Sequence, residues 1–407
     1  MKIIYLHQYF NTPRMKGGTR SYEMARRMVE AGHEVHIVTS TRELNRNSSG
    51  WSLTNEDGIH VHWLTVPYDN KMSYFRRIVA FFQFAIKARR KAVEIGGDLV
   101  FATSTPLTIA IPGVYAKKRL KIPMVFEVRD LWPELPIVMG AIKSPILKWL
   151  ARKLEHYAYF NADHVIGLSP GMSEGVKKTG YPNDRISTIP NSCDLNLFDP
   201  ESNDGSEFRR KFNWLQERPL VIYAGTLGHI NGVVYLAELA SKVYELNPEV
   251  RFLVVGSGVD DDKVRSRALE LGVYEKNFFM LESVNKQEIP SIFAAATIST
   301  SLFIELPQMW ANSANKFFDT LAAGKPVVIN YGGWQKDIIC KEQIGEVLPT
   351  EANETAAKLV VDLINDENRL KACGKNSRSL AEERFSRDML ALQLLETLES
   401  VYEKGQK

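Results

Sequence analysis

The amino-acid sequence alternates short apolar runs with longer segments in which apolar residues have helical spacing, and this alternation occurs twice. The runs lie at residues 3–6, 35–40, 60–64, 98–104, 123–128 and 164–169 in the first half, and at residues 219–225, 250–258, 277–281, 296–303, 326–330 and 345–349 in the second. Short runs between helices are typical of a parallel sheet covered on both faces. The sequence therefore predicts an α/β protein of two Rossmann-like, doubly wound parallel-sheet domains with an interdomain cleft, a common place for a small-molecule site.

The length of the chain also indicates more than one domain. It has 407 residues, and a single hydrophobic core rarely supports so many. A polar stretch at residues 196–208 interrupts the alternation and predicts a linker. We therefore expect an N-terminal domain over residues 1–200, a C-terminal domain over residues 201–385, and an amphipathic helix over residues 386–407 that packs back toward the N-terminal domain.

Charge and cysteine content argue against several classes of protein. The 51 basic and 48 acidic residues leave a net charge of +3, so no concentrated basic footprint suggests a nucleic-acid partner. Cys193, Cys340 and Cys373 are odd in number and far apart, which gives neither a disulfide framework nor metal-ligand spacing. We expect no catalytic metal and no cofactor. No apolar run reaches the roughly 20 residues that span a bilayer, and the first run is too short for a signal peptide, so we expect a cytoplasmic protein.

A glycine-rich loop, YAGTLGHING at residues 223–232, follows the first apolar run of the second half. Glycines between a strand and a helix let backbone amides approach an anion. The spacing is not that of the dinucleotide-binding fingerprint, and the loop contains no Lys or Arg. Glycines that only permit tight packing are the alternative. A second loop, GSG at residues 256–258, also follows an apolar run and favours the anion-binding interpretation.

The segment NSANKFFDTLAAGKPVVIN at residues 312–330 supplies a candidate cation. We predict a helix that Asn312 or Ser313 caps and that ends at Gly324. Lys316 lies in its first turn, where a cation opposes the helix dipole unless an anionic ligand compensates. Asp319 lies three residues on and shares the face of Lys316. A surface Lys–Asp pair without a ligand is the alternative.

Two loops of the first half carry further candidates. EVRDLWPELP at residues 127–136 places Arg129 and Asp130 beside a Trp at the end of an apolar run, a loop that packing alone explains poorly. An internal Arg129–Asp130 salt bridge is the alternative. GGTR at residues 17–20 can approach an anion or a sugar through its backbone, and a flexible, solvated loop is the alternative there.

Residues 73–94 and 142–160 are basic and amphipathic. A helix with apolar residues on one face and Lys or Arg on the other can lie on an anionic membrane surface. An ordinary helix that buries one face against its sheet has the same pattern, so both interpretations stay open.

Taken together, several motifs make the chain resemble the family 4 retaining glycosyltransferases of the GT-B fold. The motifs are NTPRMKGGTR at residues 11–20, EVRDLWPE at 127–134, IPNSCDLNLFDP at 189–200, YAGTLGHING at 223–232, ANKFFDTLAAGKPVV at 314–328 and ERFSRD at 383–388. The resemblance covers nearly the whole chain. It is greatest to bacterial N-acetyl-L-fucosamine transferases, which build O-antigen or capsule units.

The resemblance implies that the second domain mainly holds the nucleotide-sugar donor, that the first mainly holds the acceptor, and that the reaction needs no metal. By position it implies a site of Gly17 and Gly18 near the donor phosphates or sugar, Asp130 at the reaction centre, Gly225 and Lys316 near the diphosphate, Glu282 and Val284 near the base, and Asp319 on the ribose. We also expect Arg129 and Lys316 to act in catalysis with Asp130, and Thr226 and Asn315 to bind the nucleotide sugar. Two departures concern the phosphates. Relatives read G-R-L-x-x-x-K-G where residues 225–232 contain neither cation, and the first Glu of their E-x7-E pattern is Ala311.

The function that this resemblance implies is transfer of a sugar from a UDP-sugar to a lipid-diphosphate-linked saccharide, by a cytoplasmic enzyme held peripherally on the inner face of the membrane. Two alternatives stay open. A nucleotide-sugar epimerase shares the architecture, and a non-catalytic subunit of polysaccharide assembly would account for the missing phosphate cations.

Overall fold

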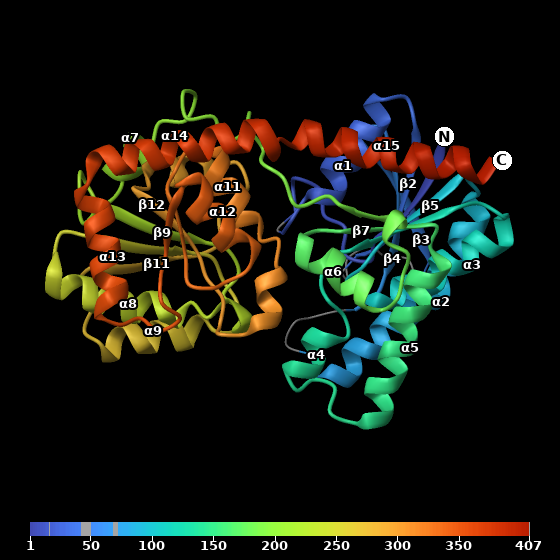
Figure 1. Cartoon of the computed structure of the whole chain (residues 1–407), viewed down its shortest axis with the longest axis horizontal. Helices are drawn as coiled ribbons and strands as arrows, with labels where there is room; N and C mark the ends of the chain where they lie inside the picture. Colours follow the sequence, from blue (N-terminus) through green and yellow to red (C-terminus); the bar gives the residue numbers. More distant parts are fainter. Residues whose placement is uncertain (16, 42–49, 68–71, 407) are drawn as a thin grey trace. The chain divides into compact units, whose positions relative to one another are not determined.

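The computed structural model describes residues 1–15, 17–41, 50–67 and 72–406 of the chain (Figure 1). The chain forms two compact units. The first comprises Met1–Pro190 together with Asp388–Lys407, and the second comprises Asn191–Arg387. The segment after Pro190 thus packs with the second unit, upstream of the expected boundary at residue 200, because Asn191 donates a backbone hydrogen bond to the Ser313 hydroxyl at 3.0 Å.

The first unit is built on an eight-stranded sheet with the order β3-β4-β2-β1-β5-β6-β7-β8. Its strands are β1 (Lys2–Leu6), β2 (Glu34–Thr41), β3 (Trp51–Glu56), β4 (Ile59–Thr65), β5 (Leu99–Thr103), β6 (Met124–Val128), β7 (His164–Gly167) and β8 (Ile186–Thr188). All neighbours pair in parallel except β3, which pairs antiparallel with β4 at the edge. The strand order reverses between β1 and β5, which makes that point the topological switch of the sheet.

Helices connect these strands. They are α1 (Arg20–Glu30), α2 (Tyr74–Ile95), the 3₁₀ helix η1 (Leu107–Ile109), α3 (Ala110–Leu120), α4 (Glu134–Val138), α5 (Pro145–Asn161), α6 (Pro170–Lys178) and η2 (Asn183–Arg185). All residues of β5 and β6 are buried, since a parallel sheet covered on both faces hides both sides of its central strands. This burial explains why these strands are mainly apolar, with Glu127 as the one charged residue of β6.

The C-terminal helix α15 (Arg387–Gln406) lies with the first unit. Asp388 Oδ1 pairs with Arg27 Nη2 at 2.6 Å, and Glu399 Oε1 pairs with His33 Nε2 at 3.2 Å. Leu394 and Leu398 are fully buried, so one face of the helix is part of the core.

The second unit is built on a six-stranded parallel sheet with the order β11-β10-β9-β12-β13-β14. Its strands are β9 (Leu220–Ala224), β10 (Arg251–Val255), β11 (Phe278–Leu281), β12 (Ile298–Ser301), β13 (Val327–Ile329) and β14 (Gly345–Val347). Its helices are α7 (Ser206–Arg210), η3 (His229–Asn231), α8 (Val234–Leu246), α9 (Asp261–Glu270), α10 (Ile289–Ala295), η4 (Pro307–Ala311), α11 (Asn315–Ala322), α12 (Trp334–Glu342), α13 (Glu354–Asn365) and α14 (Glu367–Arg384).

The switch point of this second sheet lies between β9 and β12, where the strand order reverses. Each unit is therefore the doubly wound parallel sheet that the alternating pattern predicts. Among the helices of the described residues, none has the length and apolar content needed to cross a bilayer.

Candidate functional site

The glycine loop of the second unit starts at its switch point, directly after β9. Gly225 N donates to Val255 O at 2.9 Å, and Leu227 N donates to Ser257 O at 3.1 Å, so the two glycine-rich loops pair beyond the ends of β9 and β10. A Cβ on Gly256 would lie 1.9 Å from Gly225 O. Gly256, which we cited in favour of anion binding, is thus required for close packing of the two loop backbones.

Lys316 reaches this loop from α11. Its Nζ donates to Tyr223 Oη at 3.1 Å, and Tyr223 Oη donates in turn to Thr226 O at 2.8 Å. A Cβ on Gly225 would lie 3.1 Å from Lys316 Cε, so a larger residue there would crowd the lysine. Gly225 therefore leaves room for a cation in a loop that has none of its own.

Two aromatic rings surround the ammonium group. Lys316 Nζ lies 4.6 Å from the centroid of the Tyr223 ring and 5.6 Å from that of Phe303, which follows β12. The cation thus lies between the ends of β9 and β12, where open α/β sheets bind ligands. Burial lowers the pKa of Lys316 to about 8, and Asp319 partly opposes this shift. This environment does not fit the alternative of a solvated Lys–Asp surface pair.

The start of α11 differs from the prediction. The helix begins at Asn315 with Ala314 as its cap residue, and no side chain caps it, so the assignment of Asn312 or Ser313 as cap was wrong. Asn312 Oδ1 accepts from Ala314 N at 3.1 Å, and this amide precedes the first residue of the helix. The Ser313 hydroxyl accepts from Asn191 N at 3.0 Å. Phe317 N donates to Ala314 O at 3.1 Å, and no side chain accepts from the amides that precede it in the helix, Asn315 N and Lys316 N, among the hydrogen bonds of the described residues.

The remaining predicted residues of the second unit lie around the same edge of the sheet. Thr226 and Asn315 are exposed. Glu282 and Val284 follow β11, and between them the Ser283 hydroxyl lies 3.1 Å from that of Ser257, after β10. Polar side chains therefore follow each of the strands β9, β10 and β11, and those after β10 and β11 are in hydrogen-bond contact.

Asp319 lies one helical turn beyond Lys316 in a setting that the sequence did not reveal. Burial raises the pKa of Asp319 to about 7, and the nearby Asp194 raises it further, whereas Arg387, Lys286 and Lys316 lower it. Sequence reasoning missed Tyr223, Lys286 and Arg387. Tyr223 and Arg387 lie within the motifs at residues 223–232 and 383–388, and Lys286 follows a predicted strand end, but none of these local signals indicates which side chain each residue contacts.

A second polar site lies at the switch point of the first unit. Arg129, directly after β6, donates from its backbone N to the Ser104 hydroxyl at 2.9 Å, and its Nη1 lies 3.3 Å from His7 Nε2 and 3.5 Å from Ser21 Oγ. A guanidinium only donates, so His7 Nε2 is the acceptor. Burial, and then the charge of Arg129, hold the pKa of His7 well below its usual range, so His7 is neutral.

The partner of Asp130 is not Arg129, which the alternative interpretation gave it, but Thr105. Asp130 Oδ2 accepts from Thr105 Oγ1 at 3.0 Å, while the Arg129 guanidinium turns to His7. Burial raises the pKa of Asp130, and the Thr105 hydrogen bond and Arg129 oppose that rise. The two candidate side chains are therefore held separately, rather than in the internal salt bridge of the alternative interpretation.

The other charges of this loop region have structural partners. Arg20 Nη2 pairs with the buried Glu127 at 2.9 Å, and its Nη1 donates to Pro190 O at 2.6 Å. Although burial alone would raise the pKa of Glu127, Arg20 and neighbouring groups hold it below its usual range. Gly17 and Gly18 are exposed, and Asn11 Nδ2 donates to Gly18 O at 3.4 Å.

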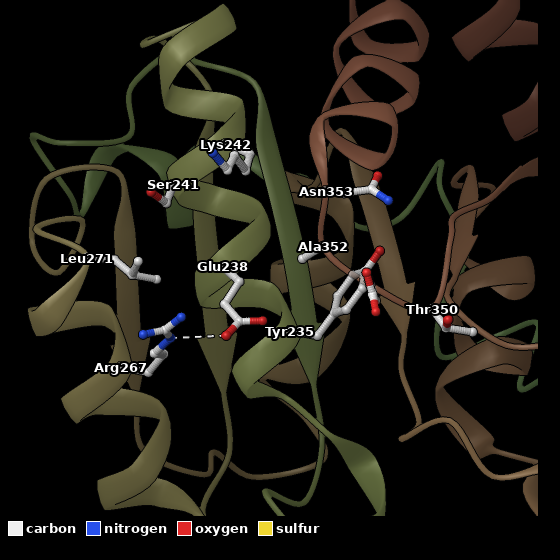
Figure 2. A pocket seen from close by; sticks show the side chains of 10 residues that line it. Tyr235, Glu238, Ser241, Lys242, Arg267, Leu271, Thr350, Ala352 and Asn353 are labelled. Atoms are coloured by element: carbon white, nitrogen blue, oxygen red, sulfur yellow. Dashed lines mark hydrogen bonds and ion pairs between the residues drawn. The ribbon is translucent and has the colours of Figure 1, made fainter.

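A hollow of about 440 Å³ on the second unit lies among α8, α9 and the segment before α13 (Figure 2). Figure 2 shows Glu238 and Arg267 paired on one side of it and Tyr235 on the other. None of the predicted site residues lines the hollow. Among the described residues, no group of three or more His, Cys, Asp or Glu is placed to hold a metal ion.

Two helices of the first unit carry large apolar side chains at the surface. On α5, Ile146 is 70% exposed and Trp149 is 58% exposed. Phe75 on α2 is 75% exposed. Further exposed apolar residues on these helices are Ile78, Val79, Phe82, Ile86, Leu147, Leu150, Tyr157 and Phe160. Each helix also buries one face, through Phe84 and Ala88 on α2 and Tyr159 on α5, so the exposed apolar residues are additional to those that pack in the core.

Comparison with known proteins gives the following matches. Residues 17–192 match the model of the glycosyl transferase 4-like domain, and residues 204–380 match that of the glycosyl transferases group 1. Spore coat protein SA of Bacillus subtilis is 23% identical over 54% of this chain and 59% of its own length. UDP-Gal:alpha-D-GlcNAc-diphosphoundecaprenol alpha-1,3-galactosyltransferase of Escherichia coli is 25% identical over 48% of this chain and 49% of its own length. The chain thus spans less than two thirds of either relative.

Among solved structures, that of Anabaena HepE in complex with UDP and glucose has a TM-score of 0.74 at 19% identity. The match covers 98% of this chain and 100% of that one. At this identity the likeness concerns the fold of the chain.

Proposed function

The chain belongs to the glycosyltransferases of the GT-B fold, with a 4-like domain at residues 17–192 and a group 1 domain at residues 204–380, and from this premise we propose its reaction. It transfers a sugar from a UDP-sugar to a lipid-diphosphate-linked saccharide, with retention at the anomeric carbon and without a metal. The sugar is an N-acetylated hexosamine such as N-acetyl-L-fucosamine, and the product is a unit of bacterial surface polysaccharide such as O-antigen or capsule.

The position of Lys316 is the observation that carries this proposal. Its ammonium lies 3.6 Å from the Cβ position of Gly225 at the switch point, between two aromatic rings. When the glycosidic bond to the donor breaks, negative charge develops on the leaving diphosphate. A cation already fixed in a partly desolvated setting stabilises that charge most at the transition state. Lys316 and the amides at the start of α11 therefore replace the two loop cations that relatives carry.

In this proposal the first unit binds the acceptor. Asp130 lies at the carboxyl end of β6 and is hydrogen-bonded to Thr105, which fixes its direction. We assign it to orienting the acceptor hydroxyl or supporting the oxocarbenium-like transition state, while the leaving phosphate takes the acceptor proton. Arg129, held by His7 and Ser21, binds an anionic group of the acceptor. This arrangement requires no second carboxylate as a nucleophile.

The membrane surface is part of the proposal because the acceptor carries a lipid. The Escherichia coli relative is named for an acceptor linked to diphosphoundecaprenol. In this chain, Phe75 on α2 and both Ile146 and Trp149 on α5 are exposed in a region rich in Lys and Arg. Apolar side chains among cations favour an anionic bilayer as their partner. We propose that these helices hold the enzyme peripherally on the inner face of the cytoplasmic membrane.

A nucleotide-sugar panel tests the proposed function. Titration calorimetry with UDP-, GDP- and TDP-sugars should show preference for UDP, and incubation of that donor with membrane extracts should yield a glycosylated lipid. Rapid appearance of an epimerised nucleotide sugar without acceptor would favour the epimerase alternative. Donor binding that never yields product with any acceptor would favour a non-catalytic assembly subunit.

A further inference from the structure

The chain passes between the two units twice, between Pro190 and Asn191 and between Arg387 and Asp388. The residues of the second unit that lie next to these two crossings are side by side. Cys193 N donates to Phe385 O at 2.7 Å, and Arg387 N donates to Cys193 O at 3.0 Å. We call residues 191–195 the crossing segment.

The crossing segment is bonded to both ends of α11, the helix that carries Lys316 and Asp319. Before the helix, Asn191 N donates to Ser313 Oγ at 3.0 Å. After it, Arg378 Nη1 donates both to Leu195 O at 3.2 Å and to Ala322 O at 2.7 Å. The helix and the crossing segment therefore form one hydrogen-bonded body.

Asp194 of the crossing segment pairs with two cations through a single oxygen. Its Oδ2 lies 3.7 Å from Lys286 Nζ, after β11, and 3.8 Å from Arg387 Nη2, at the start of α15. The Arg387 side chain is buried, and within the described part of the chain its Nε has no hydrogen-bond partner. A buried donor without an acceptor costs free energy, and loss of the carboxylate partner of a buried guanidinium costs more.

The same two cations act on Asp319. Arg387 and Lys286 are its strongest charged neighbours, followed by Asp194 and then Lys316. The charge of Asp319 also affects the buried Cys193 thiol. Burial, followed by the charge of Asp319, raises the pKa of that thiol, while Arg387 and Arg378 oppose the rise. The carboxylates of Asp194 and Asp319 thus interact with the same two cations, Lys286 and Arg387.

We propose that Asp194 is a positioning residue of the nucleotide site, which holds Lys286 and Arg387 beside Asp319 and so sets the charge that Asp319 presents to the nucleotide. The inference rests on the proposed function in one respect, that Asp319 receives the ribose hydroxyls. An ionised carboxylate accepts hydrogen bonds from two hydroxyls, whereas the protonated acid loses part of that capacity. UDP affinity therefore falls as Asp319 takes up its proton near neutral pH.

Two substitutions should move that titration in opposite directions. Asp194→Asn removes a neighbouring negative charge at nearly constant shape, so the pH at which UDP affinity falls should move down. Lys286→Gln removes a positive charge, so that pH should move up. Each shift should be about 0.5 to 1 pH unit, the size expected for one charge a few ångströms away. A purely structural role would weaken binding at every pH alike.

The experiment is titration calorimetry of UDP with the full chain from pH 5.5 to 8.5, on the wild type and both variants. Glu346→Gln is the matched control, because the Glu346 side chain is 18% exposed and paired with Arg369, as the 19% exposed Asp194 is paired with Arg387. The control should leave the profile unchanged. Coincident profiles for all four proteins would overturn the inference while the proposed function stands. A wild type that binds no UDP at any pH would overturn the proposed function, and the inference with it.

A second measurement needs no nucleotide. Because the folded pKa of Asp319 lies above its unfolded value, its contribution to stability falls as pH rises from about 4 to 7. Asp194→Asn should reduce this slope of Tm against pH, and the effect should vanish in an Asp319→Asn background. An equal effect in both backgrounds would show that Asp194 acts elsewhere and would also overturn the inference.

Discussion

The ammonium of Lys316 and the phenol of Tyr223 lie 3.1 Å apart, although 93 positions separate the two residues in the chain. Tyr223 is the penultimate residue of β9, and its hydroxyl also donates a hydrogen bond to Thr226 O in the glycine loop. These hydrogen bonds connect the helix α11, the end of β9 and the glycine loop, which are the parts of the anion site that we propose.

Replacement of Lys316 by Ala should lower kcat by about 100- to 1,000-fold, the usual loss for one fixed donor at a developing charge. The Tm should change little, since the lysine is only partly buried and lies at the first turn of α11. Steady-state assays with saturating UDP-sugar check the rate. Lys341→Ala, whose side chain is 79% exposed on the same unit, is the control and should be fully active. Full activity of the Lys316 variant would refute the phosphate assignment.

Binding of UDP should take up a proton above neutral pH. The pKa of Lys316 is about 8 in the free chain, so part of the population is neutral at pH 8.5, and the diphosphate recharges it. Calorimetric heats measured at that pH in buffers of different ionisation enthalpy should therefore differ. Lys316→Arg keeps the charge at all these pH values and should abolish the difference. Buffer-independent heats in the wild type would contradict the prediction.

Removal of the Tyr223 hydroxyl should show how much the position of the Lys316 ammonium contributes to catalysis, because the charge of the lysine is kept. Tyr223→Phe keeps the ring beneath the ammonium but deletes the hydrogen bonds to Lys316 and Thr226, leaving one carbonyl without that donor. We expect a loss of about 1 kcal/mol in unfolding free energy and a drop of about tenfold in kcat. Denaturant unfolding and kinetics measure the two effects. Tyr235→Phe, which deletes a hydrogen bond to Pro349 O in the same unit, should affect stability alone.

The stability of the first unit should fall in mild acid because of a histidine cluster. His36 Nδ1 and His62 Nε2 lie 3.0 Å apart, and burial lowers the pKa of His62 to about 4. A histidine with a depressed folded pKa stabilises the fold above its unfolded pKa of about 6.5, and that stability is lost as pH falls toward 4. The loss should be on the order of 2 kcal/mol. Thermal unfolding from pH 7 to 4.5 should show a smaller slope for His62→Gln than for the wild type.

The exposed half of α5 should bind anionic vesicles. The double change Ile146→Glu and Trp149→Glu places acids where two apolar side chains are 70% and 58% exposed, so binding to vesicles of phosphatidylcholine and phosphatidylglycerol should drop at least tenfold. Co-sedimentation measures it, and neutral vesicles should bind weakly in all cases. Leu269→Glu, at a residue 58% exposed on the second unit, should have no effect. Equal vesicle binding by the double variant would remove this role for α5.

Some elements of the fold were predictable because their signals are local. We could predict β5 and β9 from their apolar runs, because the hydrophobic period of neighbouring residues indicates a buried strand. We could predict the end of α11 from the glycine that follows it, because Gly and Pro end helices. The antiparallel strand β3 was missed, because its alternating half-buried pattern carries few apolar residues. It is a strand only through its pairing with β4.

Candidate residues were predictable where they follow a strand or open a helix, as Arg129, Asp130, Gly225 and Lys316 do. The hydrogen-bond partners of the residues next to them were not predictable. Ser313 has the residue type of a helix cap, yet its hydroxyl accepts from Asn191, which lies 122 positions away. A local capping rule cannot anticipate a donor that only folding brings near.

The sequence by itself determined the two parallel sheets, the places where loops leave their carboxyl ends, and which residues of those loops can bear charge, because hydrophobic period and turn chemistry act over a few residues. Tertiary structure alone decided the partners of those charges. Arg20 pairs with the buried Glu127, Lys316 with Tyr223, and Asp194 with Arg387. Each of these pairs joins segments far apart in the chain, and desolvation, which sets their pKa values, exists only once the core has closed around them.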